Sequence, residues 1–124
     1  MRCITVVGDA ATFGILTVSD RAHSGEYQDE GGPAILEFFE QAIASEWRAH
    51  CIIVPDEQDL IEEALTSMVD DLDCDVVVTT GGTGPAPRDI TPEATIAICE
   101  RIMPGFGEQM RAISLAFVPT AILS

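Results

Sequence analysis

Apolar residues fall into short runs separated by longer amphipathic stretches along this chain. Continuous apolar runs typical of buried strands occupy residues 13–20, 48–54 and 75–78, and residues 119–124 are predicted to form a further strand that enters the sheet. Most of the stretches between them place apolar residues at the 3.6-residue period of amphipathic helices. Strands that alternate with helices every ~25–35 residues are typical of a parallel sheet with right-handed crossovers. The pattern therefore predicts an α/β fold with a mainly parallel sheet.

Four segments are predicted to be helical. They begin near Pro33, within residues 55–59 and near Thr91, and the last covers residues 108–115. In the first three, the apolar side chains at helical spacing are expected to face the core. These side chains are Ile35, Leu36, Phe39, Ala42 and Ile43 in the first helix, Leu60, Ile61, Ala64, Leu65, Met68, Val69 and Leu72 in the second, and Ala94, Ala97, Ile98 and Ile102 in the third.

The remaining segments have weaker patterns. Residues 1–12 are assigned as an N-terminal extension of unclear role, in which 3–7 could form a strand and 8–11 a turn, and residues 13–124 as the domain. Residues 21–32 lack apolar periodicity and predict a long polar loop, a kind of segment that is often functional. Residues 103–107, rich in glycine and proline, predict a break between the last two helices.

Composition narrows the class of protein. The chain has 124 residues, enough for one domain, and no apolar run approaches the ~18 residues needed to span a bilayer, so we expect a soluble, cytoplasmic protein. Its net charge is −15, from 21 acidic residues against six arginines. This balance argues against nucleic-acid or anionic-membrane partners, which require a basic surface. The four cysteines are widely separated and are interpreted as small buried residues.

One stretch combines several features of a phosphate-binding loop. Residues 79–92 read Thr-Thr-Gly-Gly-Thr-Gly-Pro-Ala-Pro-Arg-Asp-Ile-Thr-Pro, between a predicted strand and a predicted helix with Thr91 as N-cap and Pro92 in its first turn. Its glycines permit positive φ and exposed backbone N–H groups. Arg88 offers a guanidinium to phosphate, and Asp89 offers an oxygen ligand to Mg²⁺. A stiff strand-to-helix turn explains the same residues equally well.

Polar residues also follow two other predicted strands. Asp56 comes directly after the second strand, where it could cap the next helix or share a Mg²⁺ with Asp89. Ser19, Asp20 and Arg21 end or follow the first strand. Ligands of open α/β sheets bind at the carboxyl ends of strands, so these positions suit a site, although a polar strand-end turn is an ordinary alternative.

Several stretches of the chain resemble a known family. Residues 79–95 look like the signature loop of the Mog/MoaB family of molybdenum cofactor biosynthesis, and the resemblance runs from about Phe13 to the last residue. Two C-terminal stretches favour the Mog branch over the MoaB, gephyrin-type and CinA-type branches. The further matching stretches are Val18-Ser19-Asp20-Arg21 with Ser24-Gly25 and Tyr27-Gln28-Asp29, then 55–58, 103–111 with 113–115, and 118–124.

The resemblance implies a trimeric enzyme with a three-layer α/β/α fold that transfers AMP from Mg-ATP to the terminal phosphate of molybdopterin and releases pyrophosphate. It also implies that the product is handed to a molybdenum-inserting enzyme. Asp56 and Asp89 would be the catalytic and Mg²⁺-binding residues. The substrate-binding residues implied are Ser19, Asp20, Thr80, Gly81, Gly82, Thr83, Gly84, Arg88 and Ser114.

The resemblance departs from the family pattern at both ends. Family members continue after the Leu-Ser step with a further strand, a loop of the form L-P-G-x-P and closing helices, so we expect a C-terminally truncated member. Residues 1–12 do not match the family pattern. The alternative to an active transferase is therefore a fragment that binds molybdopterin without catalysis, or a scaffold-like fragment.

Overall fold

Three parallel strands form the sheet, as the sequence predicts. The computed structural model describes residues 10–124, so the strand expected at residues 3–7 lies outside the described part. The strands are β1 (Ala11–Val18), β2 (Trp47–Val54) and β3 (Val76–Thr80), in the order β2-β1-β3. The register pairs Val18 with Val54 and Thr17 with Thr80. All three strands therefore end at one edge of the sheet.

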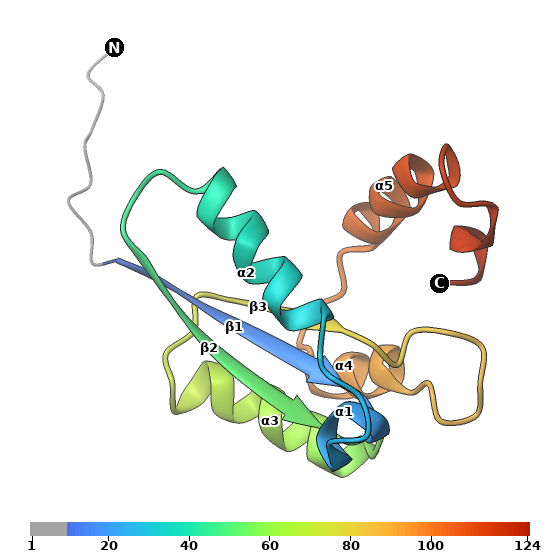
Figure 1. Ribbon diagram of the computed structural model, residues 1–124, viewed down its shortest axis with the longest axis horizontal. Coiled ribbons are helices and arrows are strands. Elements are labelled where there is room, and N and C mark those ends of the chain that lie inside the picture. The colour runs from blue at the N-terminus through green and yellow to red at the C-terminus, as the bar shows by residue number, and fades with distance from the viewer. Residues whose placement is uncertain (1–9) are drawn as a thin grey trace.

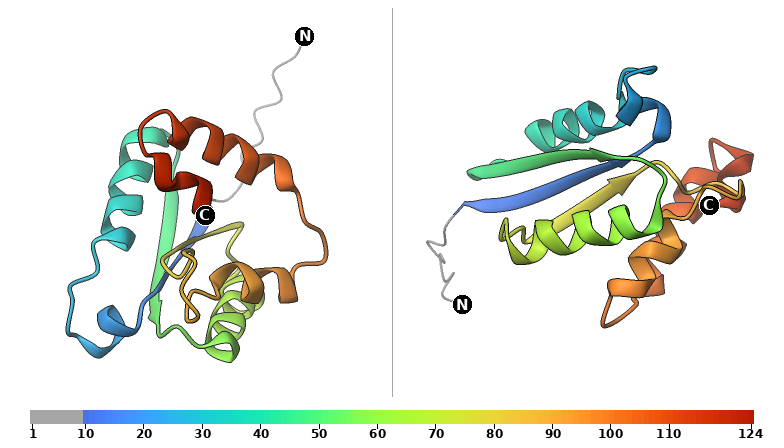
Figure 2. Two further views of the ribbon diagram at one scale, coloured as in Figure 1. Left: turned by 90° about the vertical axis from the view of Figure 1, so that its right-hand side faces the viewer. Right: turned by 90° about the horizontal axis from the view of Figure 1, so that it is seen from below.

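Helices cover both faces of the sheet, which confirms the three-layer α/β/α arrangement. Helix α2 (Gly31–Ala42) lies on one face, and α3 (Gln58–Asp70) with α4 (Thr91–Ile98) lies on the other (Figures 1 and 2). Both α2 and α3 connect parallel strands. Each face of the sheet therefore has its own packing layer.

The core lies between β1 and α3. Leu16, Ile61 and Met68 are fully buried there, and Ala94 of α4 closes its edge. Most of the apolar side chains of α3 that were predicted to face the core do so, because they are spaced at the helical period. Its two outermost members, Leu60 and Val69, are 42% and 51% exposed.

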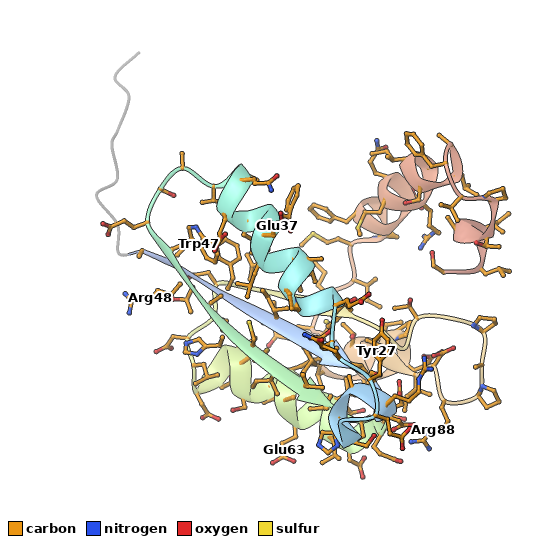
Figure 3. All side chains as sticks on the ribbon, in the orientation of Figure 1. Tyr27, Glu37, Trp47, Arg48, Glu63 and Arg88 are labelled. Atoms are coloured by element: carbon orange, nitrogen blue, oxygen red, sulfur yellow. The ribbon has the colours of Figure 1, made fainter. Side chains whose placement is uncertain are left out.

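The layer on the α2 side is thinner. Phe13 of β1 packs against Phe39 of α2 with ring centroids 4.6 Å apart. Trp47, which is labelled in Figure 3, meets both rings edge-on. The predicted core side of α2 is otherwise only half-buried, and Ala42 is exposed. Only α2 covers this face of the sheet among the described residues, so no second helix packs beside it to bury its apolar side chains fully.

A short helix interrupts the predicted polar loop 21–32. Helix α1 (Asp20–Ser24) has Ser19 as its N-cap residue, whose hydroxyl oxygen accepts a hydrogen bond from the N–H of Ala22. Its C-cap residue is Gly25, with φ 80°. A serine N-cap and a left-handed glycine C-cap are sufficient to stop both ends of one turn. Apolar periodicity cannot reveal such a turn, because none of its residues is buried.

The C-terminal segment differs most from the prediction. Helix α5 (Pro104–Leu115) includes the predicted break, because Pro104 stands in the first turn, where proline is tolerated. Residues Pro119–Leu123 form the 3-10 helix η1 instead of a strand. Both pack mainly on each other (Figure 2). The predicted inner side chains Ala97, Ile98 and Ile102 are exposed, and Ile102 lies outside α4, which ends at Ile98. Large apolar residues are also exposed at Ile96 of α4 and throughout the last segment: Met103, Phe106, Met110, Ile113, Leu115, Phe117, Val118, Ile122 and Leu123.

Of the three cysteines among residues 10–124, Cys74 is buried as expected, whereas Cys51 and Cys99 are exposed. No helix within residues 10–124 is long and apolar enough to cross a membrane.

Candidate functional site

A cavity opens where the three strands end. Its volume is about 420 Å³, and all its lining residues come from the segment between Thr17 and Asp89. The carboxyl edge of a parallel sheet is the usual place for a ligand in such folds. The lining residues are Thr17, Val18, Ser19, Asp20, Arg21, Ala22, Tyr27, Asp29, Glu30, Gly31, Asp56, Thr80, Gly81, Gly82 and Asp89.

Two glycines form the turn that leaves β3. Gly81 has φ 89° and Gly82 has φ 64°, while Gly84 is outside this positive range. A Cβ at Gly81 would overlap the carbonyl oxygen of Val18, and one at Gly82 would overlap the hydroxyl of Thr91. Both the conformation and the close approach therefore require glycine at these two positions.

Thr91 holds this turn from the start of α4. Its hydroxyl donates to the carbonyl oxygen of Gly81 at 2.9 Å, and its N–H donates to that of Gly82 at 3.1 Å. The predicted role of Thr91 as N-cap is wrong, because Ile90 is the N-cap residue and Thr91 begins the helix. The buried hydroxyl is instead used to satisfy a carbonyl group of the glycine turn, and Pro92 stands in the first helical turn as predicted.

Asp20 and Asp56 fasten two strand ends to each other. The N–H of Asp20 donates to Oδ2 of Asp56 at 2.8 Å, and the N–H of Asp56 donates to Oδ1 of Asp20 at 3.0 Å. Asp56 therefore does not cap α3, whose N-cap residue is Glu57, without a side-chain bond. The second oxygen of Asp56, Oδ1, faces the glycine turn and lies 3.1 Å from the position of a Cβ at Gly82.

Arg88 is bound by carboxylates of both neighbouring segments. Its Nε donates to Oδ2 of Asp20 at 2.7 Å, and its Nη2 donates to Oδ1 of Asp20 at 3.1 Å and to Oε1 of Glu57 at 2.8 Å. The hydrogen bond from Arg88, followed by that from the N–H of Asp56, lowers the pKa of Asp20. The same contact with Asp20, and then that with Glu57, raises the pKa of Arg88. Arg88 thus ties the glycine-rich loop to the other two strand ends.

Asp29 is a cavity residue that the sequence prediction did not include. Its Oδ2 accepts from the hydroxyl of Thr17 at 2.8 Å, and its Oδ1 accepts from the N–H groups of Gly31 and Gly32 at 3.0 and 3.2 Å. It therefore anchors the start of α2 to β1. The N-cap residue of α2 is Glu30, without a side-chain bond. An aspartate directly before this residue and the Gly-Gly pair could have revealed the bonds of Asp29 to the first N–H groups of the helix.

The structure gathers most, but not all, of the predicted site residues. Seven of them line the cavity: Ser19, Asp20, Asp56, Thr80, Gly81, Gly82 and Asp89. Thr83, Gly84 and Arg88 belong to the same loop as Gly82 but are not among the lining residues. Ser114 lies exposed in α5 and is not brought to the cavity.

The carboxylates of the cavity fit a Mg²⁺ that is shared with a ligand. Among residues 10–124, no three His, Cys, Asp or Glu side chains gather into a metal cluster. Asp56 and Asp89 both line the cavity, and Asp89 is held by the N–H of Ala86 at 3.0 Å. Mg²⁺ is commonly bound by one or two carboxylates together with substrate phosphates and water. This donor set is therefore suited to Mg²⁺ only when a phosphate ligand completes the coordination.

Comparison with known proteins gives the family. A family model described as "Probable molybdopterin binding domain" matches residues 14–124. The chain is 56% identical over 112 residues to the molybdopterin adenylyltransferase of Escherichia coli K12, covering 90% of this chain and 57% of that protein. The chain thus spans little more than half the length of this relative.

Solved structures agree with the sequence match. The molybdopterin biosynthesis enzyme MoaB from Thermus thermophilus superposes with a TM-score of 0.79 and 42% identity, covering 92% of this chain and 70% of that one. The molybdopterin biosynthesis Mog protein from Mycobacterium ulcerans gives a TM-score of 0.79 and 39% identity, covering 93% and 73%. The chain therefore belongs to the molybdopterin-binding domain family that includes Mog and MoaB.

Proposed function

We propose that this protein transfers AMP from Mg-ATP to the terminal phosphate of molybdopterin and releases pyrophosphate. The observation that carries the proposal is the cavity in which the Gly81–Gly82 turn faces the free oxygen of Asp56, with Asp89 in the same wall. The relatives named as molybdopterin adenylyltransferases support it.

The proposed reaction needs little from the protein beyond positioning and neutralisation of charge. The attacking group is a phosphate oxygen that is already ionised, so no Ser–His or Cys–His pair is required. A bond forms from the phosphate oxygen of molybdopterin to the α-phosphorus of ATP. The bond from the α-phosphorus to the oxygen that bridges it to the β-phosphorus breaks, and pyrophosphate leaves with this bridging oxygen. Phosphoryl-type transfers of this kind depend on alignment and electrostatic stabilisation.

The glycine-rich loop and the two carboxylates receive separate roles under this proposal. The turn at Gly81 and Gly82 holds the molybdopterin phosphate with Thr80 and Ser19, and Thr83 and Gly84, which follow in the same loop, lie next to it in sequence. Asp56 and Asp89 hold Mg²⁺, which would neutralise the phosphate charge when bound. The Asp20–Asp56 contact fixes one oxygen of Asp56 and leaves the other for the metal.

The test is pyrophosphate release from ATP by the purified chain with molybdopterin and Mg²⁺. We expect release that depends on all three, and a decrease of at least about 100-fold in Asp56→Ala and Asp89→Asn. Molybdopterin binding should change little in both variants. Normal turnover by either variant would refute the assignment of the metal ligands.

A second candidate is molybdopterin binding without transfer. It is favoured by the fact that no described residue after Asp89, and thus none of α4, α5 or η1, lines the cavity. Binding of molybdopterin, measured by calorimetry, without pyrophosphate release would select it. Absence of molybdopterin binding by folded protein would exclude both candidates.

We further propose a cytoplasmic homotrimer that passes its product to a molybdenum-inserting enzyme. The family resemblance supports this proposal. Sedimentation equilibrium of the purified protein tests the trimer, since a monomer at micromolar concentration would contradict it.

A further inference from the structure

The cavity wall is strongly acidic and contains a single basic side chain. Five carboxylates line it, from Asp20, Asp29, Glu30, Asp56 and Asp89, whereas Arg21 is the one arginine among its lining residues. An anionic ligand in such a wall requires positive charge close to it. Arg21 and a bound divalent metal are therefore the groups that could supply this positive charge.

The two arginines at this edge of the sheet differ in what they contact. Arg88, the expected phosphate ligand, already donates three hydrogen bonds to two carboxylates. No carboxylate of residues 10–124 forms an ion pair with Arg21. A phosphate would have to displace two carboxylates from Arg88, whereas it meets no such competitor at Arg21.

Tyr27 holds the Arg21 side chain in place. The guanidinium carbon of Arg21 lies 5.5 Å from the centre of the Tyr27 ring, a distance that allows a cation–π contact. The ring is itself fixed, because its hydroxyl donates to Oε2 of Glu30 at 3.2 Å and the N–H of Tyr27 donates to the carbonyl oxygen of Arg21 at 3.2 Å. Figure 3 shows Tyr27 beside α1 at the sheet edge that also carries Arg88.

We propose that Arg21, supported by the ring of Tyr27, binds a phosphate group of the ligand in this cavity, and that Arg88 is a positioning residue. The inference rests on the proposed function in taking the ligand to be a phosphate ester. A guanidinium matches a phosphate through two parallel N–H donors, and stacking on an aromatic ring leaves its edge available for them. Tyr27 then acts through Arg21 and needs no contact with the phosphate.

The experiment compares binding of ATP, inorganic pyrophosphate and adenosine by calorimetry in the presence of Mg²⁺. We expect Arg21→Gln to weaken ATP and pyrophosphate binding at least about tenfold, the effect of a lost charge-assisted hydrogen bond, and to leave adenosine binding unchanged. Arg21→Lys, which keeps the charge and loses the planar fork, should fall between wild type and Arg21→Gln. Arg88→Gln is the matched control and should weaken pyrophosphate binding less than Arg21→Gln.

Two tyrosine variants separate the ring from the hydroxyl. Tyr27→Phe keeps the ring and should bind pyrophosphate as wild type does, while Tyr27→Leu should weaken binding in the direction of Arg21→Gln. Unfolding midpoints identify any variant that is not folded, and Arg21→Lys then serves in place of Arg21→Gln. Wild-type affinity for both pyrophosphate and molybdopterin in folded Arg21→Gln, or an equal loss for adenosine, would overturn the proposal.

The ligand that supplies the phosphate is resolved by a parallel titration with molybdopterin. A loss confined to ATP and pyrophosphate assigns Arg21 to the nucleotide, and a loss confined to molybdopterin assigns it to the pterin phosphate. Wild-type protein that binds pyrophosphate through Arg21 but releases none from ATP would refute the proposed transfer and retain this inference.

Discussion

The positions where Cβ atoms of residues 81 and 82 would stand are occupied by oxygen atoms of two other segments. At Gly82 the competitor is the hydroxyl of Thr91, and Oδ1 of Asp56 lies 3.1 Å away. Any side chain there would push apart the glycine turn, the start of α4 and a carboxylate of the cavity. Glycine at this position is thus required by the geometry that the proposed site needs.

Replacement of Gly82 by alanine is expected to cost at least about 2 kcal/mol of folding free energy, because left-handed backbone and overlap with Thr91 act together. Urea unfolding measures this loss. Gly105→Ala is the control, since nothing lies within 4 Å of its Cβ position and it belongs to α5. The control should be neutral or slightly stabilising. Equal stability of the two variants would contradict the strained turn.

The contact between Asp20 and Arg88 should make stability depend on acid pH. Because the fold lowers the pKa of Asp20, this contact contributes stability above pH ~4, where an unfolded aspartate is ionised, and the contribution is lost as pH falls through the lower folded pKa. The stability difference between wild type and Arg88→Met should therefore shrink from about pH 6 to about pH 3.

Carbon NMR titration of the Asp20 carboxyl checks the same point at the residue itself. Its pKa should rise in Arg88→Met. In Glu57→Gln it should stay low, because that variant leaves the Asp20–Arg88 contact intact. An unchanged pKa in Arg88→Met would show that the ion pair does not form in solution.

At the scale of elements, one side chain joins the loop after β3 to helix α4. Thr91→Val keeps the shape of the side chain but removes the donor to the carbonyl oxygen of Gly81, at a position that is 2% exposed. We expect a loss of about 1–3 kcal/mol in urea unfolding and weaker ligand binding, because the turn loses its fastening.

Thr95→Val is the matched control for this prediction. Its hydroxyl bonds back to the carbonyl oxygen of Thr91 at 2.7 Å within the same helix, a local bond that adds little to helix stability. A Thr95→Val protein as destabilised as Thr91→Val would mean that the connection to the glycine turn is not what matters.

The elements whose patterns depend on burial were predictable from sequence. The strands and the α3 stripe follow from apolar period, because the core beside β1 enforces it. Residues 103–107 were predicted to be a break from their glycine and proline content, but Pro104 is tolerated in the first turn of α5. Residues 119–124 were predicted to be a strand from their apolar content, but Ile122 and Leu123 stay exposed and no sheet packing fixes the segment as a strand. The one-turn helix α1 depends on two caps, Ser19 and Gly25, and has no buried residue to give a period.

The same distinction applies to the site. The strand-end residues Ser19, Asp20, Asp56 and the glycine turn meet because parallel strands end together, which sequence order suffices to predict. The partner of each polar group did not follow from sequence. Arg88 binds Asp20 and Glu57, residues 68 and 31 positions away, and only the fold brings such distant residues together.

For the molecule as a whole, the net charge of −15 is the dominant electrostatic feature. Mutual repulsion among surface carboxylates destabilises a compact state and is screened by salt. We expect the urea midpoint to rise between about 0.02 M and about 0.5 M NaCl, since the two half-exposed ion pairs of Arg88 contribute little in the opposite direction. A midpoint that stays constant or falls would show that local ion pairs outweigh the general repulsion.

The most direct test of the proposed activity follows the α-phosphorus of ATP. ATP carrying a radiolabel at the α-phosphorus is incubated with Mg²⁺, molybdopterin and the purified chain, and a parallel sample carries the label at the γ-phosphorus. We predict that the α-label appears in molybdopterin, that the γ-label appears in pyrophosphate, and that Asp56→Ala abolishes both. Folded wild-type protein that binds molybdopterin but leaves the α-label in ATP, or that transfers the γ-label to molybdopterin, would contradict AMP transfer at this cavity.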